Sequence, residues 1–241
     1  MMNSRFPAPQ QPGWAQPVPV VDAARVQAFI RTVYAWMFGG LGLTAAAAAW
    51  VFLSPAMQQI VLGSRGVFIG LVLAELGLVI WLSFRIQKMS PGAAAAAFLV
   101  YSLLNGLTIS VILFVYTAGS IVQAFLTAAG MFGAMSIYGL VTKRDLTSWG
   151  SFFFMGLIGI IIASVINIFW QNSALSMAIS FIAVFVFVGL TAYDTQKLKR
   201  MAAAAADGER ATNFAVIGAL ALYLDFINLF LALLRLMGDR R

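Results

Sequence analysis

The sequence predicts an all-α integral membrane protein built as a bundle of seven transmembrane helices, and three observations support this. Of the 241 residues, 62% are hydrophobic and only 10% are charged, whereas a soluble domain has about 25% charged residues. Long apolar segments recur along the chain, each near the roughly 20 residues needed to cross a bilayer. The basic residues lie mostly in the breaks between these segments, as they do in the loops of membrane proteins. The net charge of +7 therefore does not indicate nucleic-acid binding.

Residues 1–24 differ in composition from the rest of the chain. Five prolines and three glutamines fall within the first 19 residues, a composition typical of an extended or disordered tail. The central apolar region and cleavage site of a signal peptide are absent. We therefore expect a Pro-rich tail at 1–24 and a membrane domain at 25–241, with a first span that is not removed.

Seven segments are long and apolar enough to cross a membrane. They are residues 28–53, 66–84, 92–116, 119–141, 149–170, 174–196 and 212–237. The first contains Gly39, Gly40 and Gly42 before a run of alanines, and the third begins with another alanine run. Small residues of this kind let helix backbones approach closely within a membrane.

The distribution of charges predicts how the spans are oriented. If the N-terminal tail and every second loop share one side, that side collects eleven of the fifteen basic residues. The positive-inside rule then places the N-terminus in the cytoplasm and the C-terminus outside. Arg235, Arg240 and Arg241 do not fit, since they follow the last span. A re-entrant last segment would return them to the cytoplasm, but we favour seven full spans.

Acidic residues on the last two spans are the main candidates for function. Asp225 lies about 13 residues into the last span with Asn228 on its face, and Asp194 precedes Lys197 by three residues near the end of the span before. A charged carboxylate at the bilayer centre costs at least ~2.5–3.5 kcal/mol unless it is paired, hydrated or protonated. Two carboxyls within a few ångströms cannot both ionise cheaply, so they titrate as a unit. We predict a proton-operated latch, closed while one proton is shared and loosened when both acids ionise.

The chain contains no histidine and no cysteine, which narrows the chemistry. Imidazole and thiolate metal ligands and histidine bases are excluded, so a pH response between about 5 and 8 must come from carboxylates or similar groups. Paired carboxylates suit calcium, which prefers ~6–8 oxygen ligands. Carbonyl groups, asparagine side chains and water would have to complete that shell, and we expect no tightly bound cofactor.

Several other spans carry polar residues. Glu75 lies near the middle of the second span, and Arg85 follows it by ten residues at the cytoplasmic end, too far away for a direct pair. Asn105 and Thr108 share one helix face in the third span, and Asn167 lies in the fifth. Singly, such residues mostly form interhelical hydrogen bonds. Together they indicate a polar interior.

The segments around the two aspartates resemble the sixth- and seventh-helix motifs of the Bax inhibitor-1 family. These segments are AYDTQ at 192–196 and YLDFINLF at 223–230. Supporting segments are SFRI at 83–86, YSLLNGLT at 101–108 and SVINIF at 164–169. The resemblance covers about residues 25–238, and its motifs are specific in combination rather than singly.

This resemblance implies a bundle whose last helix is enclosed by the other six, in a bacterial cytoplasmic (inner) membrane. It also implies a pH-sensitive calcium leak gated by Asp194 and Asp225, with Arg85 as the arginine that tunes the latch by hydrogen bonding. Further pore-lining candidates are polar residues within the spans: Glu75, Asn105, Asn167 and Asn228. Bacterial members of the family are also associated with restraining a membrane-bound ATP-dependent protease.

Three functions compete. The first is a pH-gated cation leak channel, not an enzyme, whose partners are the lipid bilayer, calcium ions and protons. The second is a non-catalytic membrane regulator of an ATP-dependent protease. The third is an intramembrane aspartyl protease, since such enzymes share a proton between two aspartates. The Gly-x-Gly-Asp motif of that class is absent before Asp225, where the sequence is Leu222-Tyr223-Leu224, and we favour the channel.

Overall fold

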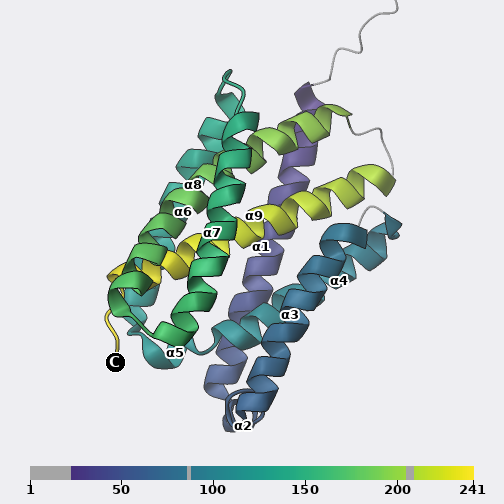
Figure 1. The fold of residues 1–241 in the computed structure, drawn as a ribbon. Helices are drawn as coiled ribbons and strands as arrows, with labels where there is room; N and C mark the ends of the chain where they lie inside the picture. Colours follow the sequence, from purple (N-terminus) through teal and green to yellow (C-terminus); the bar gives the residue numbers. More distant parts are fainter. Residues whose placement is uncertain (1–22, 86–87, 205–208) are drawn as a thin grey trace, which may run out of the picture.

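A computed structural model describes residues 23–85, 88–204 and 209–241. The described residues form helices joined by short loops (Figure 1). The helices are α1 (Ala23–Leu53), α2 (Pro55–Leu62), α3 (Arg65–Arg85), α4 (Pro91–Ile109), α5 (Ile112–Val115), α6 (Ala118–Val141), α7 (Thr147–Trp170), α8 (Ser173–Ala204) and α9 (Glu209–Met237). All but the last two residues of the predicted Pro-rich tail lie outside the described residues.

Eight of the helices in the described ranges form seven spans that are long and apolar enough to cross a membrane, which confirms the predicted fold class. They are α1, α3, α4 together with α5, α6, α7, α8 and α9. The third span is interrupted between Ile109 and Ile112. There the amides of Leu113 and Phe114 donate to carbonyl groups three residues earlier, at 3.0 and 3.1 Å. This is the tighter hydrogen-bond pattern of a 3₁₀ turn.

Three helices begin at hydroxyl residues that the sequence places in the loops. The side chains of Ser54, Ser90 and Thr117 accept hydrogen bonds from the backbone N–H of the third residue of α2, α4 and α6. Pro55 and Pro91 follow the two serines directly. Proline is favoured at the first helical position because its missing N–H would have no partner there. These caps fix where the loops end and the helices begin.

The last helix forms the centre of the bundle. In the most apolar 18-residue stretch of α9, 72% of the residues are buried, compared with 6% in the corresponding stretches of α3 and α7. Helix α9 packs against α1, α4, α6 and α8. Helix α3 packs mainly on α4, and α7 mainly on α8, so these two form the outer flanks. The expectation of a highly buried last helix is therefore confirmed.

The packing of α1 against α4 depends on a glycine. A methyl group added at Gly106 of α4 would collide with the backbone of Thr44 and the side chain of Ala47 in α1. The two backbones therefore approach more closely than any larger residue permits, as small residues allow in membrane helix pairs. This seam brings Thr44 close to the centre of the bundle.

The C-terminus is fastened at the end of the bundle opposite the start of α1 (Figure 1). The carbonyl of Asp239 accepts a hydrogen bond from Thr117 N at 3.1 Å, and Arg241 N donates to Val115 O at 2.9 Å. The backbone N–H of Asp239 also donates to the Ser120 hydroxyl at 2.9 Å. Helix α9, which precedes these contacts, is long and apolar enough to cross a membrane.

Candidate functional site

The two predicted aspartates lie beside each other in the interior. Asp194 is half-buried on α8 and Asp225 is 4% exposed on α9. Their carboxyl groups lie close enough for a hydrogen bond between the two side chains. Such a bond requires a proton on one of them, because ionised carboxylates only accept. The second carboxyl oxygen of Asp225, Oδ2, has no hydrogen-bond partner among the described residues.

A cavity of about 600 Å³ lies against this aspartate pair, between α7, α8 and α9. Both aspartates line it together with Asn228, and the exposed Lys197 lines it as well. Lys197 is the cation that acts electrostatically on Asp194, from one turn further along α8. The cavity therefore connects the buried Asp225 with the exposed end of α8.

A close approach between α7 and α8 forms part of this cavity. A methyl group added at Gly150 of α7 would collide with the ring of Tyr193. Glycine at position 150 therefore lets the tyrosine ring lie against the α7 backbone. This contact sets the separation of the two helices at the residue preceding Asp194.

A second polar cluster joins four helices in the interior. Glu75 of α3 accepts hydrogen bonds from the Asn105 amide and, at 2.9 Å, from the Thr108 hydroxyl of α4. The Tyr223 hydroxyl of α9 donates to Asn105 Oδ1 at 2.9 Å. The same hydroxyl lies 2.6 Å from the Thr44 hydroxyl of α1. The predicted stripe on the third span is thus the hydrogen-bonding partner of Glu75.

Two predicted residues lie apart from both clusters. Arg85 is the last residue of α3 and is exposed. It is not among the groups that act on either aspartate, so the structure does not bring the predicted tuning residue to the pair. Asn167 lies in the last turn of α7, where its Oδ1 accepts a hydrogen bond from Asn172 N at 3.0 Å. Helix α7 ends at the left-handed residue Gln171. The Asn167 side chain therefore stabilises the turn between α7 and α8.

Three residues that make these polar contacts were not predicted from the sequence. Tyr223 and Thr44 lie in runs of apolar residues, and nothing local indicates that their hydroxyls meet. Gln196 lies two residues after Asp194, yet its side chain binds the backbone of the α6–α7 loop. The one signal for Tyr223 was its place in the segment 223–230 that carries the family resemblance.

The oxygen donors at the aspartate pair are few. Within the described ranges no group of three or more acidic, histidine or cysteine side chains could hold a metal ion. Two carboxyls and the Asn228 amide supply fewer oxygens than the ~6–8 that calcium prefers. The arrangement suits transient contact with a hydrated cation better than permanent coordination.

Comparisons with known proteins show the family of this seven-helix chain. Residues 26–241 match the family model described as "Inhibitor of apoptosis-promoting Bax1". The chain is 50% identical over 224 residues to "Inner membrane protein YbhL" of Escherichia coli K12, covering 92% of this chain and 96% of that protein. It is 43% identical over 216 residues to an uncharacterized protein of Deinococcus radiodurans, covering 90% and 92% respectively. A family model that covers nearly the whole chain settles its membership. The chain is a membrane protein of the Bax inhibitor-1 family.

Proposed function

We propose that this protein is a pH-sensitive cation leak channel of a bacterial inner membrane, with calcium as a permeant ion and Asp194 and Asp225 as its gate. The observation that carries the proposal is the direct approach of the two carboxyl groups. It occurs where α8 packs against the most buried helix of the bundle. Any change in the charge of the pair therefore acts on the contact between these two helices.

The proton on the pair is the switching element. With one proton shared, the two side chains form a charge-assisted hydrogen bond that holds α8 against α9. Without it, two like charges face each other where the surroundings screen charge poorly. Their repulsion favours separation of the helices or entry of a cation between them. The other polar residues that line the cavity beside the pair are Lys197, Asn228, Tyr193 and Ser151.

The cavity beside the pair offers a route for the ion. Its volume of about 600 Å³ accommodates water as well as a cation, since a water molecule occupies about 30 Å³. On this proposal the ion keeps part of its water shell and exchanges the rest for carboxyl and amide oxygens. The cluster around Glu75 supplies a second group of oxygen atoms between α3 and α4.

The membrane and the orientation are part of the proposal. The printed name of the Escherichia coli relative, an inner membrane protein, supports the location. The basic residues Lys143, Arg144, Lys199 and Arg200 lie in or beside the loop that joins α6 to α7. Under the positive-inside rule this end of the bundle faces the cytoplasm.

Calcium flux into proteoliposomes between pH 5 and 8 tests the gate. The parent protein is compared with Asp194→Asn and Asp225→Asn, and Asp239→Asn serves as the matched control because Asp239 is an exposed acid beyond the end of α9. We expect a pH-dependent flux in the parent and the control, and a shifted or flattened pH profile in both gate variants.

Two results would count against the proposal. If both gate variants keep the pH profile of the parent, the pair is not the gate. If the parent gives no flux above empty liposomes, the channel proposal fails. A non-catalytic regulator of another membrane protein then becomes the better hypothesis.

A further inference from the structure

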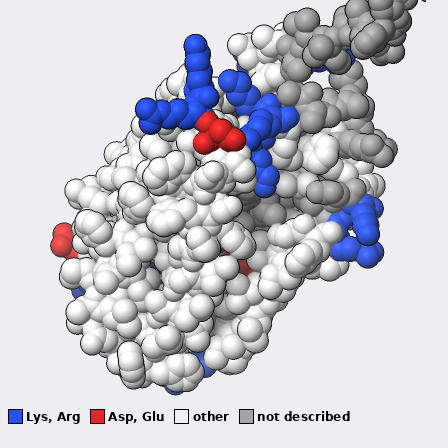
Figure 2. Space-filling view, turned by 45° about the horizontal axis from the view of Figure 1, so that its top comes forward, with Lys and Arg blue, Asp and Glu red and all other residues white. Residues whose placement is uncertain are grey.

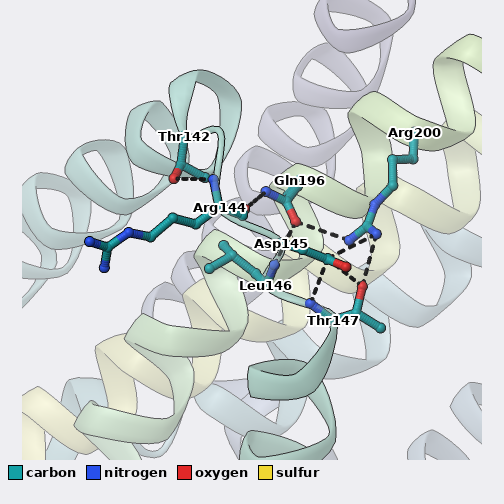
Figure 3. A network of polar contacts seen from close by, with 7 residues as sticks. All are labelled: Thr142, Arg144, Asp145, Leu146, Thr147, Gln196 and Arg200. Carbon is teal, nitrogen blue, oxygen red and sulfur yellow. Dashed lines mark hydrogen bonds and ion pairs between the residues drawn. The ribbon is translucent and has the colours of Figure 1, made fainter.

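The loop between α6 and α7 is held in place by a side chain of α8. Gln196 is 8% exposed, and its amide nitrogen donates to the carbonyl of Arg144 at 2.7 Å. Its amide oxygen accepts a hydrogen bond from Leu146 N at 2.9 Å (Figure 3). The two bonds reach the loop backbone on either side of Asp145. The loop conformation is therefore fixed by the body of the bundle.

The negative charge of Asp145 is paired within the same network. Its carboxylate accepts hydrogen bonds from the hydroxyl and the backbone N–H of Thr147, at 2.6 and 3.0 Å. Arg200 lies 3.2 Å away and also donates to the Thr147 hydroxyl at 2.8 Å. The hydrogen bonds from Thr147, and then the nearby Arg200 guanidinium, hold the pKa of Asp145 below its ordinary value. Asp145 is thus ionised at neutral pH and already paired with Arg200.

Arg144 is left with an uncompensated charge. Its guanidinium has no hydrogen-bonded or ion-paired partner in the part of the chain that the structure describes. In the close-up its side chain extends away from the other residues of the network (Figure 3). Figure 2 shows basic side chains gathered around an acidic one at the forward-facing end of the bundle. An anion that approaches this end meets an arginine that no carboxylate neutralises.

A groove of about 270 Å³ lies directly beside Arg144, between α6, α7 and α8. Its other walls are mostly apolar, with Tyr138, Leu146, Trp149, Phe153 and Ala192 among them. Asp145 also lines the groove, and its carboxylate is paired with Arg200. Trp149 is 54% exposed and Tyr138 is 41% exposed. Each lies within one turn of the end of its helix, Trp149 near the start of α7 and Tyr138 near the end of α6. That is the depth at which tryptophan and tyrosine gather at a membrane–water interface.

We propose that this groove binds an anionic phospholipid, with the headgroup phosphate on Arg144 and the upper acyl chain along Trp149 and Phe153. A guanidinium matches a phosphate geometrically and can hold it with two hydrogen bonds. Basic pockets between transmembrane helices are known to bind lipid headgroups. A zwitterionic lipid is disfavoured, because its own cation competes with Arg144 for the phosphate.

The apolar walls favour a lipid over a free phosphate ion. A phosphate ion would use Arg144 alone and leave the rings of Trp149 and Phe153 without a function. A lipid places its headgroup at the rim and its chain against these rings. The two ligands therefore differ in whether an acyl chain contacts Trp149.

Fluorescence quenching by brominated lipids tests this contact. The full-length protein is reconstituted in phosphatidylcholine containing a fixed fraction of phosphatidylglycerol, with bromine on the acyl chains of one lipid or the other. The signal of Trp149 is isolated as the difference between the parent and Trp149→Phe. We expect brominated phosphatidylglycerol to quench this signal more strongly than brominated phosphatidylcholine at an equal mole fraction. Arg144→Gln should lower this preference roughly fivefold, as expected for one basic residue at a membrane surface.

Arg65→Gln is the matched control, because Arg65 is an exposed arginine at the start of α3 and does not line the groove. It should leave the preference unchanged, as should inorganic phosphate added to the buffer. Equal quenching by the two lipids would overturn the proposal. A preference that survives Arg144→Gln would also overturn it, and loss of the preference on addition of phosphate would show a site for free anions instead. Among the residues that the structure describes, the Arg144 side chain makes no hydrogen bond or ion pair that its replacement would break.

Discussion

The hydroxyl of Tyr223 donates a hydrogen bond to Asn105 Oδ1 at 2.9 Å, and this bond ties the central helix α9 to α4. On its other side Asn105 donates to Glu75 of α3. Thr44 of α1 meets the same tyrosine hydroxyl at 2.6 Å. Tyr223 lies two residues before Asp225, so a chain of hydrogen bonds through four helices reaches α9 on the same turn as the aspartate.

Replacement of Tyr223 by phenylalanine should destabilise the protein without creating a cavity. The change removes the two buried hydrogen bonds that the Tyr223 hydroxyl makes with Thr44 and with Asn105 Oδ1, and we expect a loss of about 1–2 kcal/mol in the free energy of unfolding. Unfolding in detergent measures it. Tyr138→Phe, at an exposed position on α6, should be neutral, and equal stability of the two variants would contradict the network.

Replacing Glu75 by alanine should destabilise the protein more than replacing it by glutamine. Alanine leaves the donors of Asn105 and Thr108 without their acceptor, whereas glutamine retains one oxygen. Interhelical hydrogen bonds in membranes contribute about 0.6 kcal/mol on average and up to about 1.7 kcal/mol. Detergent unfolding should therefore rank the parent above Glu75→Gln and that variant above Glu75→Ala. A reversed order would show that Glu75 has no structural partners.

The seam between α1 and α4 should not tolerate an added methyl group. In Gly106→Ala the new methyl meets the Thr44 backbone, and overpacking of this kind costs about 1–3 kcal/mol. Gly77→Ala is the control, because nothing lies near the methyl group it would add. Thermal denaturation should separate the two variants clearly. If Gly106→Ala is as stable as Gly77→Ala, α1 and α4 do not approach each other as closely as described.

The α6–α7 loop should loosen in acid. The pKa of Asp145 is lower in the folded protein than in the unfolded chain, chiefly because Thr147 donates two hydrogen bonds to the carboxylate. The contribution of ionised Asp145 to the stability of the loop is thus fully present above the ordinary aspartate pKa of about 3.9. It is lost as the pH falls through the lower folded value. Hydrogen exchange in the segment 142–148, corrected for intrinsic rates, should be faster in Asp145→Asn than in the parent at pH 7.

At pH 3 that difference should shrink, because acid begins to neutralise Asp145 in the parent as well. Asp239→Asn is the control, since Asp239 is an exposed acid beyond the end of α9. If hydrogen exchange in the loop at pH 7 is equally fast in Asp145→Asn and in the parent, the network drawn in Figure 3 is contradicted.

Local hydropathy was sufficient to predict the seven spans. It also singled out Asp194 and Asp225, because an acid within an apolar run is costly unless it has a partner. Helical spacing likewise predicted the stripe that contains Asn105 and Thr108. These features depend on short stretches of sequence, and a single chain is enough to reveal them.

The remaining contacts depend on how the helices rotate and tilt against one another. The partners Thr44 and Tyr223 are 179 residues apart in the chain, and no periodicity indicates that they meet. Arg85, the predicted tuning residue, lies exposed at the end of its helix. Asn167, a predicted pore-lining residue, lies at the end of α7 and binds the following turn. Hydropathy places a residue along a span but does not determine which neighbour it faces.

The central claim is that Asp194 and Asp225 share a proton whose loss changes the flux. Infrared spectroscopy of the protein in lipid tests it directly, by following the absorption of protonated carboxyl groups from pH 5 to 8. We predict a band that disappears over the same pH range in which the calcium flux changes, and that is altered in both Asp194→Asn and Asp225→Asn but not in Asp145→Asn. A spectrum that is identical in the parent and Asp225→Asn, or a flux that changes where the band is constant, would contradict the account.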